Sequence, residues 1–516
     1  MSCPRDYNAA SEFIDSHRAA GRAAKTAVID DDNAYTYGEL AERVNRAGNA
    51  LLGLGLGQES RVAMIMLDSI GFPAVFWGAI KAGIIPIPIN TLLHSESWRE
   101  ILADCRAQAV IVSEPLLAEV RSALVDQRFL AHVIVDGEAG ANDLSLQGLM
   151  AQADPELDCA PTCADEVAFW LYSSGSTGAP KGVLHLHRHL IATARLYGEG
   201  VLGIQEDDVV FSAAKLFFAY GLGNGMTFPF AVGATAVYTA QRPTPDAVMA
   251  VLRNQQPTIY GGVPTLYAAI LANKDNCRET GSPRLRRCIS AGEALPKEVG
   301  ERWAERFGAD ILDGVGSTEL LHIFLSNSPE EVRYGTSGRA VPGYQLRLVD
   351  DKGGQVQDGE IGELLVNGPS ACTAYWNRRD QSLATFHGPW TRTGDKYYRD
   401  EAGLYHYCGR TDDMFKVSGQ WVSPFEVESA LIAHEDVLEA AVIPIETGEG
   451  LLKPKAYVLL KEGAVAGPTM AETLQGFVKA RIATVKYPRA IEFIDELPKT
   501  ATGKIQRFKL REHERG

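Results

Sequence analysis

Short runs of apolar and β-branched residues alternate with longer helical patterns through the first two thirds of the chain. Three of these runs span residues 62–67, 110–113 and 133–136. Parallel strands need crossover connections of a dozen or more residues, and a helix is the usual connection. The alternation therefore predicts an α/β architecture built from several sheets.

The pattern changes after residue 345. From there to residue 407, glycine, aspartate and tyrosine are frequent among short alternating runs, as in antiparallel strands joined by tight turns. Beyond Arg410 a strand, helix and strand pattern returns, with predicted helices at 424–434 and 469–484 and strands at 437–445 and 455–461. We predict a large N-terminal domain of mixed sheets with a β-rich subdomain, residues 1–411, and a small α+β C-terminal domain, residues 412–516.

Charge and cysteine usage exclude several classes of partner. The net charge of −15 is spread along the chain without a long run of Lys or Arg, so neither nucleic acid nor an anionic membrane is expected to bind. The longest apolar stretch, residues 70–89, contains three prolines and a lysine and predicts a helix, a turn and a buried strand. Eight irregularly spaced cysteines without a secretory leader indicate a reduced, cytoplasmic protein.

An apolar strand runs into a loop of hydroxyls and glycines in the segment LYSSGSTGAPKG, residues 171–182. Glycines let backbone N–H groups approach phosphate oxygens, hydroxyls donate hydrogen bonds, and a lysine supplies a movable charge. The loop is no Walker A motif, which, counted from Gly175, would need glycine at Pro180. It predicts a polyphosphate site, with a flexible surface turn as the alternative. Its residues are Ser173, Ser174, Gly175, Ser176, Thr177, Gly178 and Lys181.

Two further motifs combine acidic and polar side chains with glycine. The segment DGVGSTE, residues 313–319, ends in a hydroxyl and a carboxylate, and Glu319 offers the hard oxygen that Mg²⁺ prefers while Thr318 can donate to a phosphate. Residues 393–395, TGD, form an acidic turn that Arg410 follows, although an aspartate after glycine is often only a turn.

Together with the segment LPKTATGKI at residues 497–505, these motifs resemble the adenylate-forming superfamily of acyl-CoA ligases, adenylation domains and luciferases. Within it, the chain is most similar to the benzoate-CoA and hydroxybenzoate-CoA ligases, from about residue 35 to about residue 511. The resemblance implies that ATP and Mg²⁺ activate an aromatic carboxylic acid as its acyl-adenylate. Coenzyme A then takes the acyl group, so that aryl-CoA, AMP and pyrophosphate are the products.

The resemblance also implies catalytic roles. Lys504 is the adenylation lysine, which would bridge the carboxylate and the α-phosphate as charge develops. Glu319 would hold Mg²⁺, while Thr318 and Lys181 would contact phosphates. Asp412 occupies the place of the hinge about which the C-terminal domain rotates, with an exposed linker acid as the alternative.

Other residues are implied to bind the nucleotide or CoA. Asp313 would accept from the adenine amino group, and Asp395 would accept from both ribose hydroxyls, reinforced by Arg410. The remaining residues are Ala291, Gly292 and Glu293 along the adenine, Gly314 in the turn and Gly419 in a loop on the CoA side.

The segment KLFFAYGLGNG, residues 215–225, has the composition of a wall for a flat ring, with ordinary core packing as the alternative. By resemblance, Phe218 gates the pantetheine tunnel and Ala219 and Tyr220 touch the aryl group. His322 would orient the carboxylate or donate to a backbone carbonyl. The other expected pocket residues are Gly261, Val315 and Gly316.

Two positions depart from the family pattern. Many relatives carry an aromatic residue in the place of Val315, where it stacks on adenine, and benzoate ligases tend to carry tyrosine in the place of Gly261. The missing phenol leaves space that a para-hydroxyl would fill, although the sequence does not show which side chain would bind it. We therefore expect 4-hydroxybenzoate or a related hydroxybenzoate as substrate, with benzoate or an aminobenzoate as alternatives.

Competing functions fit parts of the pattern. One is an adenylating enzyme that loads a carrier protein, and another is a nonenzymatic nucleotide-binding protein, against which Lys504 argues. Alternation of His185, His187 and His189 would place three imidazoles on one side of a strand, but no acidic or cysteine partner lies nearby, so we expect no metal there. Relatives are often dimers, so a homodimer is one of the possible oligomeric states.

Overall fold

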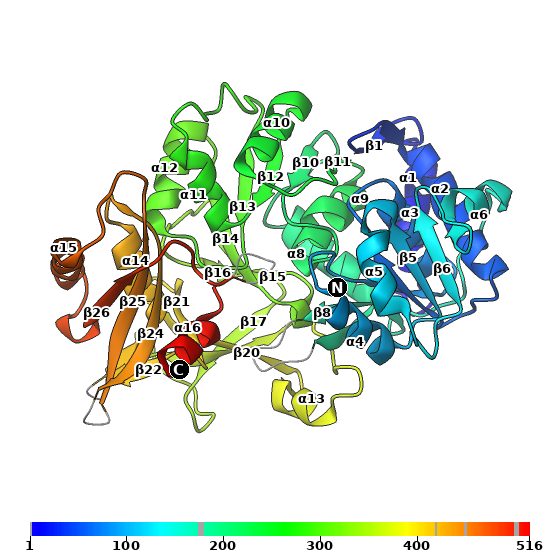
Figure 1. Cartoon of the computed structure of the whole chain (residues 1–516). Helices are drawn as coiled ribbons and strands as arrows, with labels where there is room; N and C mark the ends of the chain where they lie inside the picture. Colours follow the sequence, from blue (N-terminus) through cyan, green and yellow to red (C-terminus); the bar gives the residue numbers. More distant parts are fainter. Residues whose placement is uncertain (1–2, 174–179, 418–419, 448–450, 500–504, 516) are drawn as a thin grey trace.

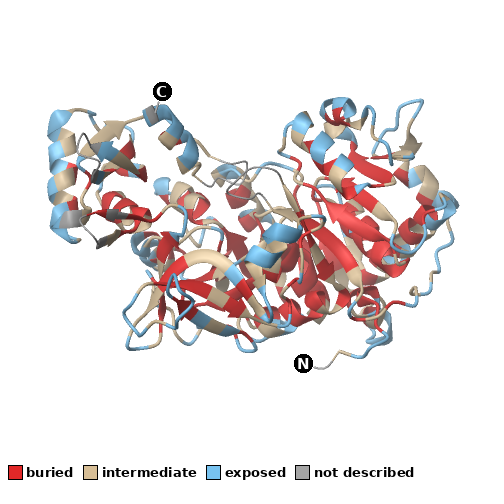
Figure 2. Ribbon diagram, turned by 90° about the horizontal axis from the view of Figure 1, so that it is seen from below, coloured by how far each residue is buried: buried red, intermediate tan, exposed pale blue. Residues whose placement is uncertain are grey.

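The computed structural model describes residues 3–173, 180–417, 420–447, 451–499 and 505–515. N-terminal elements form one end of the molecule, and the C-terminal strands and helices form the other (Figure 1). Buried residues concentrate along the strands and on the helix faces that cover them (Figure 2). No helix in these ranges has the length and apolarity needed to cross a bilayer.

A parallel five-stranded sheet lies near the N-terminal end, with strand order β4-β3-β5-β6-β7. This sheet confirms the parallel strands expected from the alternating pattern. The apolar stretch at 70–89 forms a helix, a turn and a strand, as predicted. Its strands are β3 (Arg61–Ile65), β4 (Ile85–Pro88), β5 (Ala109–Ser113), β6 (His132–Asp136) and β7 (Leu144–Ser145). The associated helices are α2 (Tyr37–Gly53), α3 (Gly71–Lys81), α4 (Ser95–Cys105), η2 (Glu114–Leu116), α5 (Leu117–Leu124) and α6 (Leu146–Gln152).

A nine-stranded mixed sheet occupies the middle of the molecule, with order β16-β15-β14-β13-β12-β10-β11-β1-β2. The strands from β14 to β1 are parallel, and antiparallel strands close both edges. Ligands of parallel sheets usually bind beyond the carboxyl ends of the strands. The strands are β1 (Thr26–Ile29), β2 (Ala34–Thr36), β10 (Val209–Ser212), β11 (Thr235–Val237), β12 (Ile259–Gly262), β13 (Arg287–Ser290), β14 (Ile311–Gly316), β15 (Ile323–Ser326) and β16 (Arg339–Ala340).

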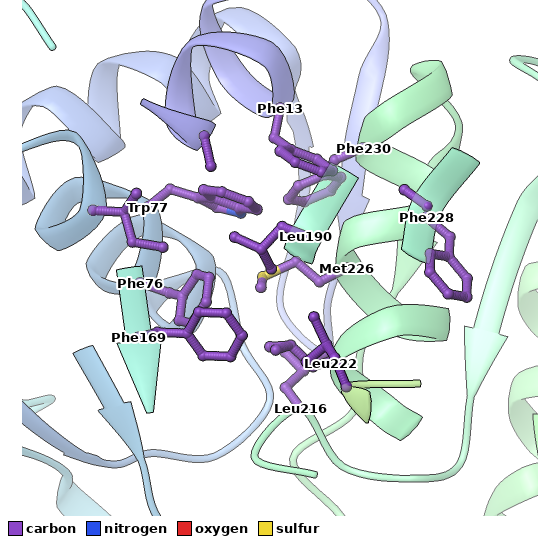
Figure 3. Close-up of a cluster of buried hydrophobic side chains, with 14 of the residues drawn as sticks. Phe13, Phe76, Trp77, Phe169, Leu190, Leu216, Leu222, Met226, Phe228 and Phe230 are labelled. Atoms are coloured by element: carbon purple, nitrogen blue, oxygen red, sulfur yellow. The ribbon is translucent and has the colours of Figure 1, made fainter. Parts of the chain in front are cut away.

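Helices that precede or connect the strands of the nine-stranded sheet contribute buried side chains to the interior of the molecule. In Figure 3, aromatic side chains of the N-terminal part and of α3 face Leu222 and Met226, so that one apolar core joins the two regions. The helices are η1 (Ser11–Asp15), α1 (Ser16–Ala19), α7 (His187–Thr193), η3 (Ala194–Glu199), α8 (Ala219–Leu222), η4 (Gly223–Thr227), α9 (Phe228–Val232), α10 (Pro245–Gln255), α11 (Pro264–Ala272), α12 (Lys297–Phe307) and η5 (Thr318–Leu320).

The predicted β-rich subdomain is an antiparallel sheet in which β20 pairs with three other strands. A separate antiparallel pair, β8 (Val167–Ser173) and β9 (Lys181–Leu186), flanks the predicted phosphate loop. The elements of the β-rich sheet are β17 (Gln345–Val349), β18 (Gly362–Asn367), α13 (Arg379–Thr385), β19 (Phe386–His387), β20 (Trp390–Arg399) and β21 (Tyr405–Arg410).

The C-terminal elements enclose an apolar core of their own, which confirms a small α+β domain within the predicted fold class. The exact boundary at residue 412 stays a prediction. The elements are β22 (Phe415–Val417), β23 (Gln420–Val422), α14 (Pro424–Ile432), β24 (Val437–Thr447), β25 (Leu451–Leu460), α15 (Pro468–Lys479), η6 (Thr484–Lys486), β26 (Ala490–Phe493) and α16 (Arg507–Arg515).

Candidate active site

The β8–β9 pair positions the two ends of the predicted phosphate loop. Ser173 ends β8 and pairs with Lys181, which begins β9. Antiparallel pairing thus presents the hydroxyl and the lysine at the same edge. The loop residues 174–178, as well as Gly419 and Lys504, lie outside the described residues, and their predicted roles stay predictions.

Tyr375 joins two of the predicted catalytic residues. Its hydroxyl donates a hydrogen bond of 2.9 Å to Oε1 of Glu319, and the Nζ of Lys181 lies 5.1 Å from the centroid of its ring. Burial, reinforced by the Glu319 carboxylate, raises the pKa of Tyr375, so the phenol keeps its proton and acts as the donor. The motifs did not include Tyr375, because an aromatic residue among apolar neighbours looks like core packing.

A buried histidine supports the backbone beside Glu319. Nε2 of His185 lies 2.9 Å from the carbonyl oxygen of Thr318, and burial lowers the pKa of His185 to about 3. The imidazole is therefore neutral and donates through Nε2. This contact ties the end of the phosphate-loop hairpin to the turn that carries the predicted magnesium ligand.

The three alternating histidines do not share one strand. His185 lies on β9, but the strand ends at Leu186, and His187 and His189 belong to α7. His187 accepts a hydrogen bond from the backbone N–H of Ala9. In the described ranges, no group of three or more His, Cys, Asp or Glu side chains could hold a metal ion.

Asp313 supplies a buried acceptor in β14, where the pairing of this strand with β13 ends. It pairs in register with Ser290 of β13, directly before the predicted adenine-binding residues Ala291, Gly292 and Glu293. Its Oδ1 atom is buried without a hydrogen-bond partner among the described residues, and burial raises the pKa of the carboxyl group well above its usual range. An amino group that donates to Oδ1 would satisfy this atom.

The glycines after Asp313 permit close packing of β14 on β15. A Cβ on Gly316 would come within 2.6 Å of the His322 carbonyl oxygen, and one on Gly314 within 2.9 Å of an Ile323 methyl group. Both positions therefore exclude larger side chains. In β14, Val315 is half-buried and Gly316 is exposed, so a ligand can reach both residues.

Asp395 and Arg410 form a cross-strand pair on β20 and β21. Arg410 Nη1 donates to Asp395 Oδ1 at 3.1 Å and to the Thr393 carbonyl oxygen at 3.0 Å. The nearby Asp395 carboxylate raises the pKa of Arg410. Burial raises the pKa of Tyr397, and the neighbouring carboxylates of Asp395 and Asp313 raise it further. Asp395, predicted to bind ribose, and Asp313, predicted to bind adenine, thus both act electrostatically on one buried tyrosine.

Tyr220 and His322 bring the predicted aryl pocket together. The Tyr220 hydroxyl contacts the carbonyl oxygens of Ile289 at 2.9 Å and Gly262 at 3.0 Å. Nε2 of His322 lies 3.4 Å from the Tyr220 carbonyl oxygen, and the two rings are stacked with centroids 5.8 Å apart. Burial lowers the pKa of His322 to about 3, so the imidazole is neutral and donates to this carbonyl oxygen. This is the second of the two predicted alternatives, in which His322 donates to a backbone carbonyl.

The other pocket residues differ in accessibility. Phe218 and Ala219 are half-buried at the start of α8, whereas Gly261 is buried at the end of β12. The Phe218 ring packs edge-on against Phe217, with centroids 4.4 Å apart. The structure therefore places the predicted aryl residues beside the ends of β12, β13 and β14.

A second residue that the motifs missed lies next to the predicted hinge. Asp413, which follows Asp412, contacts Arg511 at 2.9 Å and Arg507 at 3.4 Å, and both arginines belong to α16. The segment after the predicted hinge is thus bound to the helix that follows the Lys504 motif. Only the pairing in space distinguishes Asp413 from an ordinary exposed acid.

Comparisons with known proteins identify the family of the chain. The AMP-binding enzyme family matches residues 16–376, and the AMP-binding enzyme C-terminal domain matches residues 426–504. The chain belongs to the AMP-binding enzyme family. This confirms the resemblance to the adenylate-forming superfamily.

Individual relatives cover nearly the whole chain. A benzoate–CoA ligase of Thauera aromatica is 57% identical over 99% of this chain and 97% of its own length. A 4-hydroxybenzoate–CoA/benzoate–CoA ligase of Rhodopseudomonas palustris is 52% identical over 98% of this chain and 94% of its own length. The crystal structure of a benzoate CoA ligase from Burkholderia xenovorans superposes with a TM-score of 0.92 at 50% identity, covering 98% of this chain and 100% of that one.

Proposed function

We propose that this chain joins a hydroxybenzoate, such as 4-hydroxybenzoate, to coenzyme A in an ATP-dependent reaction that passes through an acyl-adenylate. The similarity to aryl-CoA ligases along the chain confirms the predicted enzyme class, an AMP-forming acid–thiol ligase that uses ATP and CoA. The observation that carries the proposal is that two groups of side chains meet around the end of β14. Lys181, Tyr375 and Glu319 lie on one side, and Tyr220 and His322 lie on the other.

The first half-reaction needs charge at the phosphates and a fixed carboxylate. Lys181 and Thr318 would contact the phosphates, Asp395 and Arg410 the ribose, and Lys504 would bridge the reacting carboxylate and the α-phosphate. The acid attacks the α-phosphorus and pyrophosphate leaves, so positioning and electrostatics do most of the catalysis. The CoA thiol then attacks the acyl carbon and AMP leaves.

Mg²⁺ would be shared between the protein and ATP. Tyr375 donates to one oxygen of Glu319, and no side chain among the described residues donates a hydrogen bond to the other. Mg²⁺ is usually bound by one or two carboxylates together with substrate phosphates and water. Bound there, it would neutralise charge on the phosphates. The donor set of Glu319 fits this role, because no cage of further ligands is required.

Rotation of the C-terminal domain about Asp412 would let Lys504 and the Gly419 loop act in turn. The contacts of Asp413 with α16 support this proposal, because they link the hinge segment to the helix beyond Lys504. In the described arrangement, the Nζ of Lys396 lies 5.9 Å from the ring centroid of Trp421, so a residue of β20 faces the CoA-side segment.

A panel of carboxylic acids tests the proposal. The purified chain with ATP and Mg²⁺ should release pyrophosphate with hydroxybenzoates, more slowly with benzoate, and very slowly with aliphatic acids. Release of AMP should depend on CoA, which separates a CoA ligase from an enzyme that loads a carrier protein. Faster turnover of an aliphatic acid, or equal specificity for benzoate, would contradict the proposed substrate.

A further inference from the structure

Asn224 has a buried side-chain amide that makes no hydrogen bond to any residue that the structure describes. It lies on the π-helical turn η4 with its side chain fully buried, and neither Oδ1 nor Nδ2 has a hydrogen-bond partner among the described residues. Buried amides are nearly always paired, because an unpaired one loses its bonds to water without replacement. An unpaired amide at this depth therefore indicates a ligand that completes it.

The Asn224 amide lies beside the space left by Gly261. A carbon placed at the Cβ position of Gly261 would lie 3.6 Å from Nδ2 of Asn224, 3.6 Å from the Tyr220 hydroxyl and 3.5 Å from Oγ of Ser212. These are ordinary van der Waals distances, so an additional atom fits there without displacing its neighbours. Ser212 and Gly261 are adjacent partners on β10 and β12, which brings the four residues together.

The hydrogen-bonding capacity around this space is asymmetric. The Ser212 hydroxyl donates to the Ala214 carbonyl oxygen at 3.0 Å, and the Tyr220 hydroxyl proton is used by the Ile289 and Gly262 carbonyl oxygens. Both hydroxyls can therefore only accept from a ligand. Asn224 alone retains both a donor and an acceptor.

We infer that Asn224 is the residue that recognises the ring substituent of the aryl acid, and that it selects a hydroxyl group. A phenolic hydroxyl donates to Oδ1 and accepts from Nδ2, so it satisfies both atoms of the amide. An aromatic amino group can donate to Oδ1 but is a poor acceptor for Nδ2, and an unsubstituted ring satisfies neither atom. The inference rests on the proposed function, because it assumes that the ring lies against Tyr220.

The replacement of Asn224 by leucine tests this inference, because it keeps the branched shape and the number of side-chain heavy atoms and removes both polar atoms. In Asn224→Leu, we expect kcat/KM for 4-hydroxybenzoate to fall by about 10- to 100-fold, as when a hydrogen-bonding site loses its partner. The kcat/KM for benzoate should stay within about 3-fold of the wild type or rise, because benzoate makes no bond to the amide. Retained benzoate turnover also shows that the variant is folded.

Two further variants separate recognition from packing. In Gly261→Ala the added methyl group occupies the space beside Asn224, so the preference for hydroxybenzoate over benzoate should fall while benzoate is still used. Thr227→Val is the matched control, since Thr227 is buried on the same turn and its replacement should leave the preference unchanged. An equal loss of preference in Thr227→Val would assign the effect to packing and overturn the inference.

The outcomes distinguish the inference from the proposed function. If the wild-type chain forms no aryl-CoA from hydroxybenzoates, the proposed substrate is wrong. If it does, and Asn224→Leu keeps the wild-type ratio of kcat/KM for 4-hydroxybenzoate to benzoate, only the role of Asn224 is refuted. A ratio that falls at least 10-fold in Asn224→Leu and also falls in Gly261→Ala supports it.

Discussion

The Tyr375 hydroxyl orients the predicted magnesium ligand without adding charge. It donates to Glu319 at 2.9 Å, so one carboxylate oxygen is fixed while the full negative charge stays available for a cation. A cation in the same place would compete with Mg²⁺ for that charge. The Tyr375 ring also lies 5.1 Å from Lys181 Nζ, within the range of a cation–π interaction.

Replacement of Tyr375 by phenylalanine should weaken the use of MgATP. Phenylalanine keeps the ring beside Lys181 but removes the donor to Glu319, and a hydrogen bond to a charged group contributes about 1.5–3 kcal/mol. We expect kcat/KM for MgATP in pyrophosphate release to fall by roughly 10- to 100-fold, with little change in CoA transfer from a supplied aryl-adenylate.

The matched control is Tyr37→Phe, which removes a buried hydroxyl that donates to Ala234 far from the phosphate loop in the sequence. Tyr37→Phe should lower stability without altering the dependence on MgATP. Unchanged kinetics in Tyr375→Phe, with only its stability reduced, would show that the hydroxyl serves folding alone.

At the scale of elements, local patterns predicted the strands and helices well but not the contacts between them. The helix expected at 424–434 is α14 (Pro424–Ile432), because Ser423 caps its start and its apolar face is regular. The helix expected at 469–484 ends at Lys479, and a short 3₁₀ turn follows. Local periodicity carries no signal for tertiary pairing, so it could not reveal that Tyr375 meets Glu319 or that Asp413 meets α16.

Glu428 joins three elements of the C-terminal domain. It is buried on α14, accepts from the backbone N–H of Val442 on β24 at 2.7 Å, and pairs with Arg507 of α16 at 2.7 Å. Burial of a charged pair is tolerated only when both groups are fully bonded, and removal of one partner leaves the other charge uncompensated. The packing of α16 should therefore depend on the Glu428 charge.

Glu428→Gln should loosen these elements locally. Glutamine keeps one hydrogen-bond acceptor for its neighbours, and Arg507 keeps its ion pair with Asp413. We therefore expect the free energy of unfolding to fall by roughly 2 kcal/mol, less than when a buried ion pair is fully broken. Hydrogen–deuterium exchange in β24 and α16 should become about 30-fold faster.

Glu426→Gln on the same helix is the matched control. Glu426 pairs with Lys486 at 2.6 Å in a more exposed position, where an ion pair contributes about 0–1 kcal/mol. Equal exchange rates in the two variants would contradict a specific role for Glu428.

At the scale of the whole molecule, buried histidines make the folded chain sensitive to acid. Burial lowers the pKa of His185 and His322 to about 3, and that of His17 and His187 to about 4, from the usual 6.5. Between these values and pH 6.5, the unfolded chain binds protons that the folded chain does not. Their contribution to stability is therefore complete above pH 6.5 and is lost as the pH falls toward 4 and 3.

Buried carboxyl groups act in the opposite direction. Burial raises the pKa of Asp68 to about 6, and it also raises the pKa values of Asp136, Glu199 and Asp313. The folded forms of these carboxyl groups bind protons more readily than the unfolded chain, so they favour the fold at lower pH. Burial also lowers the pKa of His189 well below 6.5, so five histidines oppose these four carboxyl groups. Each group contributes up to about 1.4 kcal/mol per pH unit in the window where its folded and unfolded states differ in charge. The net expectation is a loss of stability between pH 6.5 and pH 4.

The thermal unfolding temperature at constant ionic strength should therefore be several degrees lower at pH 5 than at pH 7.5. His17→Phe keeps an aromatic ring beside Tyr37, whose centroid lies 4.0 Å from that of His17, and removes one titrating group. The variant should show a smaller drop between the two pH values, because about one proton fewer is bound on unfolding. A transition temperature that rises from pH 7.5 to pH 5, or an unchanged pH dependence in His17→Phe, would show that the buried histidines do not control acid stability.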